Sequence, residues 1–165
     1  MLRILGIDPG KTGYAVEGLY EPGSAKWTLG ATFPLKTCWE VSSVTGNIDL
    51  LAFSRWLFLE PTPDLVVTED VFARKGDGAT QAFAFGGAAM LVDMSLYVAK
   101  LLHVVKYVNP ATWKANLGLA TGGTKNEKKT RSRQMAKSIF GVPFQSHDMA
   151  EAALLAYYGK RFLGV

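Results

Sequence analysis

The sequence begins with a short apolar segment that has the length and composition of a buried strand. Arg3–Asp8 reads RILGID, and a proline–glycine pair ends it. Two more strand patterns follow at Tyr14–Tyr20 and Lys26–Phe33, with the turn sequence EPGS between them. Three successive strands joined by short turns predict an antiparallel meander. We therefore expect the start of the chain to form one edge of a sheet.

The rest of the chain alternates helical and strand patterns. We expect a helix from Ile48 to Leu59, a strand at Leu65–Glu69, a helix at Ala79–Leu101, a strand at His103–Val108, two helices capped by Asn109 and Asn126, and a last helix from Ser146 to about Tyr158. This order predicts an α/β domain whose mixed sheet has an antiparallel edge. A chain of 165 residues has room for one such domain, so we expect residues 1–165 to form it.

The helix expected at Ala79–Leu101 is apolar on nearly all sides. Such a helix is predicted to be buried on all sides. If one face covers the sheet, the outer face is too apolar for solvent, and small residues at Gly86 and Gly87 would let a second helix approach closely. The sequence therefore predicts a two-fold homodimer through an outer face that includes Phe83, Gly87, Met90 and Met94.

Composition excludes several classes of protein. The single cysteine, Cys38, excludes a disulfide framework and a four-thiolate zinc site, and it suits a reducing compartment. The longest uncharged stretch, Gly78–Val92, has 15 residues, below the roughly 20 that cross a bilayer. The apolar start meets Asp8 too early for a secretory signal. We therefore expect a cytoplasmic protein with no membrane segment.

Charge is distributed unevenly along the chain. The net charge is +4, but residues 1–70 carry five basic and nine acidic residues, whereas residues 71–165 carry thirteen and five. Between residues 114 and 137, seven bases face one acid, Glu127; the bases are Lys114, Lys125, Lys128, Lys129, Arg131, Arg133 and Lys137. A solvated helix face would alternate acids with bases, so the cluster favours a polyanionic partner.

Four carboxylates stand out by position. Asp8 and Glu69 end two strands, and Asp148 and Glu151 lie one turn apart in the last helix. Each has a structural alternative, as a turn residue, a solvated strand end or an acid favoured by a helix dipole. Together they predict a site for Mg²⁺ or Mn²⁺, because hard oxygen ligands select these ions. Two such ions are the usual device for attack of water on a phosphodiester.

Four segments in order resemble RuvC-type Holliday junction resolvases of the RNase H-like superfamily. They are GIDPGKTGYA, VVTEDVFARKGDGATQAFAFGGAAMLV, VNPATWKANLG and SHDMAEAALLAYYG, and they extend over nearly the whole chain. The resemblance implies an RNase H-like five-stranded mixed sheet flanked by helices. The run HDMAEA is similar to bacteriophage members, which implies a phage origin and a location in a bacterial cell or phage-infected host.

The resemblance also implies an activity. Such a protein is a dimeric endonuclease that uses two Mg²⁺ ions, with Mn²⁺ as a substitute. It nicks two symmetric strands of a four-way DNA junction and leaves 5′-phosphate and 3′-hydroxyl ends. Its partner is branched DNA, chiefly four-way junctions, and flaps and replication forks stay open as other substrates. Asp8, Glu69, Asp148 and Glu151 match the catalytic, metal-binding acids of the family. Glu151 departs from the aspartate that is common at the last position in cellular enzymes.

Further residues gain expected roles from the same resemblance. Lys129 matches a lysine that assists near the scissile phosphate, with Lys128 as a rival one position away, and Phe72 matches an aromatic that stacks on bases. Phe72 is alternatively a core residue. The DNA-binding residues are then expected to be Phe72, Arg74, Lys75, Lys114, Lys125, Lys128, Arg131 and Arg133. His147 lies either beside the metal site or in solvent.

Three other functions remain open at this point. An actin-like phosphotransferase would hold a nucleotide with residues 8–13, but that fold needs two such domains. A non-cutting branched-DNA-binding module needs only the basic cluster and aromatics, and the four acids argue against it. A YqgF-like RNA-processing nuclease shares the GIDPG opening. The sequence identifies no helicase partner.

Overall fold

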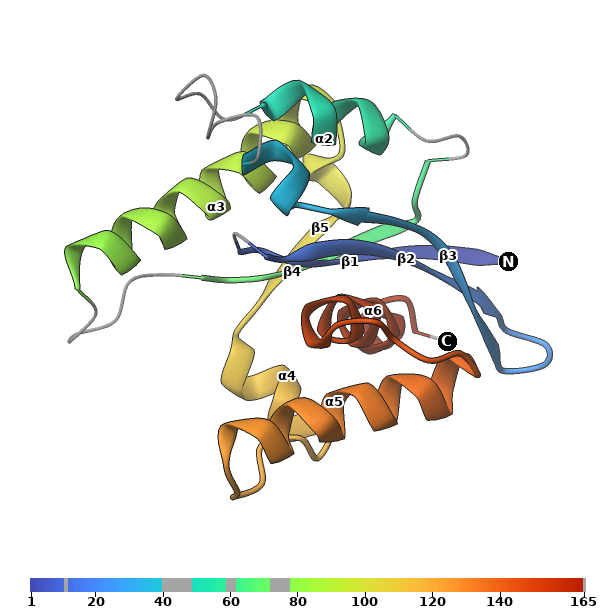
Figure 1. Cartoon of the computed structure of the whole chain (residues 1–165). Coiled ribbons are helices and arrows are strands. Elements are labelled where there is room, and N and C mark those ends of the chain that lie inside the picture. The colour runs from blue at the N-terminus through green and yellow to red at the C-terminus, as the bar shows by residue number, and fades with distance from the viewer. Residues whose placement is uncertain (11, 40–48, 59–61, 72–77, 165) are drawn as a thin grey trace.

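Five strands form one mixed sheet in the order β3-β2-β1-β4-β5 (Figure 1). The computed structural model describes residues 1–10, 12–39, 49–58, 62–71 and 78–164. The strands are β1 (Leu2–Asp8), β2 (Tyr14–Glu21), β3 (Lys26–Pro34), β4 (Leu65–Glu69) and β5 (Val105–Val108). β2 pairs antiparallel with β1 and β3, whereas β4 pairs parallel with β1 and β5. The predicted antiparallel edge on a mixed sheet is confirmed.

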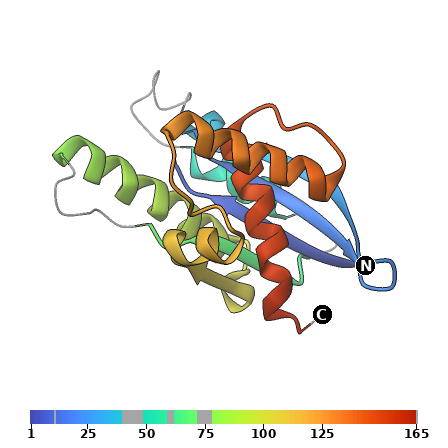
Figure 2. The same ribbon diagram turned by 90° about the horizontal axis from the view of Figure 1, so that it is seen from below.

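Helices cover both faces of this sheet. They are α2 (Leu50–Leu57), α3 (Ala79–Val98), α4 (Pro110–Asn116), α5 (Lys125–Phe140) and α6 (His147–Gly159). α2 and α3 lie over one face, while α6 crosses the other face and packs against α5 (Figures 1 and 2). Each face has its own hydrophobic cluster. No helix in the described ranges is both long and apolar enough to span a membrane.

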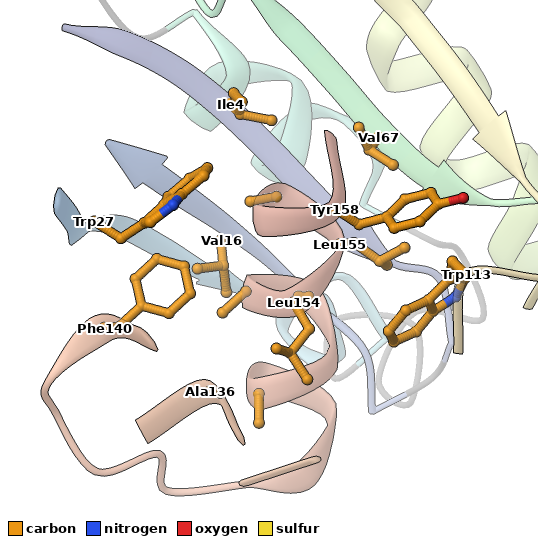
Figure 3. Packing of buried hydrophobic residues seen from close by; sticks show 14 of the residues in the cluster. Ile4, Val16, Trp27, Val67, Trp113, Ala136, Phe140, Leu154, Leu155 and Tyr158 are labelled. Atoms are coloured by element: carbon orange, nitrogen blue, oxygen red, sulfur yellow. The ribbon is translucent and has the colours of Figure 1, made fainter. Parts of the chain in front are cut away.

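The cluster under α6 is built largely around that helix. Leu154 and Leu155 point into it together with Trp27 and Phe140 (Figure 3). α6 lies directly on β1, because a Cβ at Gly6 would overlap the backbone of α6 at Ala152 and Ala156. Glycine at position 6 therefore fixes how closely α6 approaches the strand.

Helix α3 is covered on one side only. Ala88, Leu91 and Leu96 are buried against the sheet and α2, but the side chains of Phe83 and Met90 are 84% and 55% exposed. The prediction that this helix is buried on every side is wrong for the single chain. The reason is that no element of the described chain packs on its outer side (Figure 1).

Gly87 of α3 does not lie on the outer face, where the sequence predicted it. A Cβ at Gly87 would lie 3.2 Å from Cη2 of Trp39, so Gly87 faces this chain's own indole and not the outer face. A Cβ at Gly86 would meet nothing within 4 Å. Gly86 is therefore the small residue on the open side of the helix.

Three predicted boundaries are also wrong by a few residues. α5 is capped by Thr124, not Asn126, because Thr124 and Glu127 form a reciprocal capping box. α3 ends at Val98 instead of Leu101, shortly before Lys100 adopts a left-handed conformation with φ 59°. β5 begins at Val105 because Leu102–Val104 form a 3₁₀ turn.

Candidate active site

Two of the four predicted acids meet at the same edge of the sheet. The parallel pairing of β1 and β4 places Ile7 opposite Thr68, so Asp8 and Glu69 are neighbours at the carboxyl ends of adjacent strands. Side chains alternate between the faces of a strand. Val67 contributes to the cluster under α6, so Glu69, two residues later, is on the same face as α6.

The other two acids come from the first turns of α6. The Ser146 hydroxyl caps this helix by accepting a hydrogen bond from the Met149 amide at 3.0 Å. Asp148 lies in the first turn, and Glu151, one turn later, is 7% exposed. Since α6 packs on β1 and β4, its beginning projects both carboxylates towards the strand ends.

Electrostatics shows that these acids are close enough to repel one another. Burial raises the pKa of Asp8 well above its usual value, and the charges of Glu69, Glu151 and Asp148 raise it further. Burial likewise raises the pKa of Glu69, although the charge of Lys114 and a hydrogen bond from Trp113 partly offset this. The three neighbouring carboxylates therefore disfavour the ionised form of Asp8.

Lys114 lies among the acids. Its Nζ is 2.8 Å from Oε2 of Glu151 and 3.6 Å from Oε1 of Glu69, which lie on different elements, α6 and β4. Burial alone would lower the pKa of Lys114, but the charges of the two glutamates and the hydrogen bond to Glu151 raise it above its usual value. The ammonium group therefore remains charged and bridges the two carboxylates.

Two residues that contact these acids were not predicted from the sequence. The indole N–H of Trp113, which is fully buried, donates a hydrogen bond to Oε1 of Glu69 at 2.8 Å. The Ser132 hydroxyl donates to Oε1 of Glu151 at 3.1 Å. Ser132 shares the buried face of α5 with Ala136 and Phe140. A polar residue among the apolar residues of that helix face was the sequence signal that could have identified Ser132.

His147 precedes Asp148 and is half-buried beside the site. Its Nε2 lies 3.5 Å from Oε1 of Glu151. Burial lowers the pKa of His147, and the charges of Lys129 and Lys114 lower it further, although Glu151 and Asp148 oppose this. The sequence left two positions open for His147, beside the metal site or in solvent, and the structure has it beside the acids.

A groove of about 460 Å³ leads from Glu151 along α4 and α5. Lys114, Lys125, Lys128 and Lys129 line it. Lys128 is exposed, whereas Lys129 is partly buried and lies close enough to His147 to affect its pKa. Of the two rival lysines, Lys129 is therefore the one whose charge acts on His147, and the role of either lysine in catalysis stays a prediction.

The remaining predicted DNA-binding residues differ in their surroundings. Arg133 is exposed on α5, whereas the guanidinium group of Arg131 donates hydrogen bonds to the carbonyl oxygens of Thr121 and Gly122 at 2.9 and 2.8 Å. Arg131 thus holds the loop before α5. Phe72, Arg74 and Lys75 lie outside the described residues, so their roles stay predictions.

The acids suit a divalent cation by their chemistry. Four carboxylates supply hard oxygen donors, and the mutual repulsion at Asp8 is what a bound cation would relieve. However, within the described part of the chain no three acidic, histidine or cysteine side chains are already close enough to hold a metal ion. The donors are gathered in one region, but their oxygen atoms do not converge on a single point.

Comparisons with known proteins address the fold. No family model matches the sequence, and no curated protein matches it significantly. T. thermophilus RuvC in complex with a Holliday junction substrate is similar in structure, with a TM-score of 0.65, 19% identity, and coverage of 98% of this chain and 96% of that chain.

Two other solved structures are similar over most of their length. The fowlpox virus Holliday junction resolvase has a TM-score of 0.56, 15% identity, and coverage of 98% of this chain and 99% of that chain. The yeast mitochondrial Holliday junction resolvase Ydc2 has a TM-score of 0.53, 14% identity, and coverage of 99% and 81%. The chain has the RNase H-like fold of these resolvases, as the resemblance predicted.

Proposed function

We propose that this protein is a metal-dependent endonuclease that resolves four-way DNA junctions. The observation that carries the proposal is that Asp8 and Glu69 lie close to Glu151, which itself lines a groove together with several lysines. Acids that collect metal ions and bases that bind phosphate are the two requirements for phosphodiester hydrolysis. The structural likeness to three Holliday junction resolvases supports the choice of substrate.

In this proposal each residue of the site has a defined task. Asp8, Glu69, Asp148 and Glu151 would hold two Mg²⁺ ions, for which Mn²⁺ would substitute. The bound ions would supply activation of water and neutralisation of charge on the phosphodiester. Lys129 would stabilise the negative charge that grows on the scissile phosphate, and Lys125, Lys128 and Arg133 would hold the DNA backbone. The products would carry 5′-phosphate and 3′-hydroxyl ends.

We further propose that two copies act together through α3. Its outer side exposes Phe83, Met90, Met94 and Tyr97. These side chains continue into an apolar groove of about 490 Å³ lined by Tyr97, Val98, Lys100, Leu102 and His103. A two-fold dimer would bury this surface and present two acidic sites to a junction whose strands have matching symmetry. Both nicks would then follow from one binding event.

The alternatives give different products in one experiment. Labelled four-way junction, linear duplex of the same sequence and structured RNA are each incubated with the protein and Mg²⁺ or Mn²⁺, and the nicks are mapped. We expect paired symmetric nicks in the junction alone. Cleavage of RNA only would indicate the RNA-processing nuclease, and junction binding without nicks under either metal would indicate a non-cutting module.

Origin and location remain predictions from the sequence. The likeness of HDMAEA to bacteriophage members supports a phage source, and the single cysteine, Cys38, supports a reducing cytoplasm. Neither bears on the cleavage assay, which uses purified protein.

A further inference from the structure

We propose that the ammonium group of Lys114 takes the place of a metal ion in the protein without metal. It holds Glu69 and Glu151 together until a divalent cation displaces it. The ammonium group lies between these two carboxylates, at 3.6 Å from one and 2.8 Å from the other. A bound cation would need the same carboxylates. This inference rests on the proposed metal-dependent function and adds a competition between the chain's own cation and the metal.

The contacts around Glu151 show why the exchange is needed. Oε2 of Glu151 is taken by Lys114, and Oε1 accepts a hydrogen bond from Ser132. Oε1 of Glu69 accepts the indole N–H of Trp113. With these partners in place, the described acids do not form a group that could hold a metal ion. Releasing Lys114 frees one oxygen of Glu151 without disturbing the bonds from Trp113 and Ser132.

The side chain of Lys114 can also turn away from the acids into the neighbouring groove. Its side chain is 30% exposed and lines the same groove as Lys125 and Lys128. A lysine has a long flexible stem, so its ammonium group can turn from the acids towards the groove while α4 stays in place. In the groove it would meet the phosphate of a bound strand. Lys114 would thus neutralise carboxylates before metal binds and phosphate afterwards.

The test measures binding of Mn²⁺ alone by titration calorimetry, without DNA. Lys114→Gln removes the competing charge, so we expect Mn²⁺ to bind about tenfold more tightly than to the native protein. Lys114→Arg keeps the charge, so its affinity for Mn²⁺ should not rise as it does in Lys114→Gln. The control is Lys26→Gln, which removes an exposed charge at the beginning of β3 and should leave the Mn²⁺ affinity unchanged.

The opposite role predicts the opposite result. If Lys114 organised the acids for the metal, Lys114→Gln would bind Mn²⁺ more weakly, and that result, like an unchanged affinity, would overturn the inference. A role limited to the packing of α4 does not predict a gain in metal affinity. If neither the native protein nor Lys114→Gln binds Mn²⁺, the metal-dependent function itself fails and the inference fails with it. Binding to the native protein with no gain in Lys114→Gln rejects the inference alone.

A second measurement does not depend on the variant folding. In native protein labelled with ¹⁵N at lysine Nζ, the ammonium group of Lys114 gives a protected signal while it is held by Glu151. We expect Mg²⁺ to shift or broaden this signal selectively, with the signals of Lys26 and Lys160 as references far from the acids. A Lys114 signal that is unchanged at saturating Mg²⁺ would contradict displacement.

Discussion

Helices α3 and α6 have similar compositions but opposite surroundings. Both are rich in alanine and large apolar residues with little separation of polar and apolar sides. α6 lies between the sheet and α5 and is buried from Ala150 to Ala156. α3 has the sheet and α2 on one side, and its other side exposes Phe83 and Met90. Composition alone therefore does not tell whether an apolar helix is covered by its own chain.

The comparison also separates two tasks. α6 brings Asp148 and Glu151 to the strand ends, and its position is fixed by direct contact with β1 at Gly6. α3 contributes no acid to this cluster within the described residues. The proposed function places chemistry at the covered helix and association at the uncovered one, and the following changes test that division.

The largest effect is expected at the acids that α6 completes. Asp8→Asn should lower the single-turnover nicking rate on a four-way junction by roughly 10³-fold or more, because it removes a hard anionic ligand. Junction affinity should remain within about twofold, since no phosphate contact is lost. Metal-free thermal stability should not fall, because Asp8 stands among like charges. Glu21→Gln, at an exposed strand end, is the matched control, and native nicking by Asp8→Asn would refute the metal site.

The next effect concerns how α6 rests on the sheet. Gly6→Ala should reduce the free energy of unfolding by about 3 kcal/mol, because the new Cβ would overlap the backbone of α6 at Ala152. Urea denaturation measures this change. A loss below about 1 kcal/mol would show that α6 can move away from β1 at little cost. The contact at Gly6 would then not fix the position of Asp148 and Glu151 relative to the strand ends.

A third change tests the uncovered helix. Met90→Asp should weaken self-association by about 100-fold, because a charge would be placed in the centre of the apolar outer face. Sedimentation equilibrium at micromolar concentration measures it, with Val142→Asp as a control at an exposed apolar residue outside α3. Paired nicking should be lost while single nicks persist. A native protein that is already monomeric yet cuts both strands symmetrically would remove the role assigned to α3.

The smallest effect is expected at the two adjacent glycines of α3. Gly86→Ala, in the monomeric Met90→Asp background, should raise the free energy of unfolding by up to about 1 kcal/mol, because a Cβ there meets nothing and alanine favours the helix. The same substitution at Gly87 should gain less, since its Cβ would press on Trp39. Equal gains at both positions would show that Trp39 yields freely, and would weaken the distinction between the two sides of α3.

Much of the fold could be predicted from local patterns. The strand at Leu65–Glu69 and the cap at Asn109 were predicted correctly, because apolar spacing and capping depend on residues close in sequence. The cap of α5 was missed although Thr124 and Glu127 have capping-box spacing. The prediction of Asn126 as the cap overlooked this spacing.

The side-chain contacts of the site could not be predicted in this way. Trp113 and Glu69 are 44 positions apart, and Lys114 and Glu151 are 37 apart. Whether such pairs touch depends on where α4 and α6 lie relative to the sheet, which no short-range pattern encodes. The sequence indicated four candidate acids, but it did not show that a lysine bridges two of them.

The sequence by itself determined the order of strands and helices and placed Asp8 and Glu69 at strand ends, because hydrophobic periodicity and turn residues act over a few positions. The tertiary structure decided that α6 is enclosed, that α3 is open on one side, and that Gly87 faces Trp39. It also decided that Lys114 lies between Glu69 and Glu151. These outcomes depend on packing between segments distant in the chain, where a helix can be covered or left exposed with the same composition.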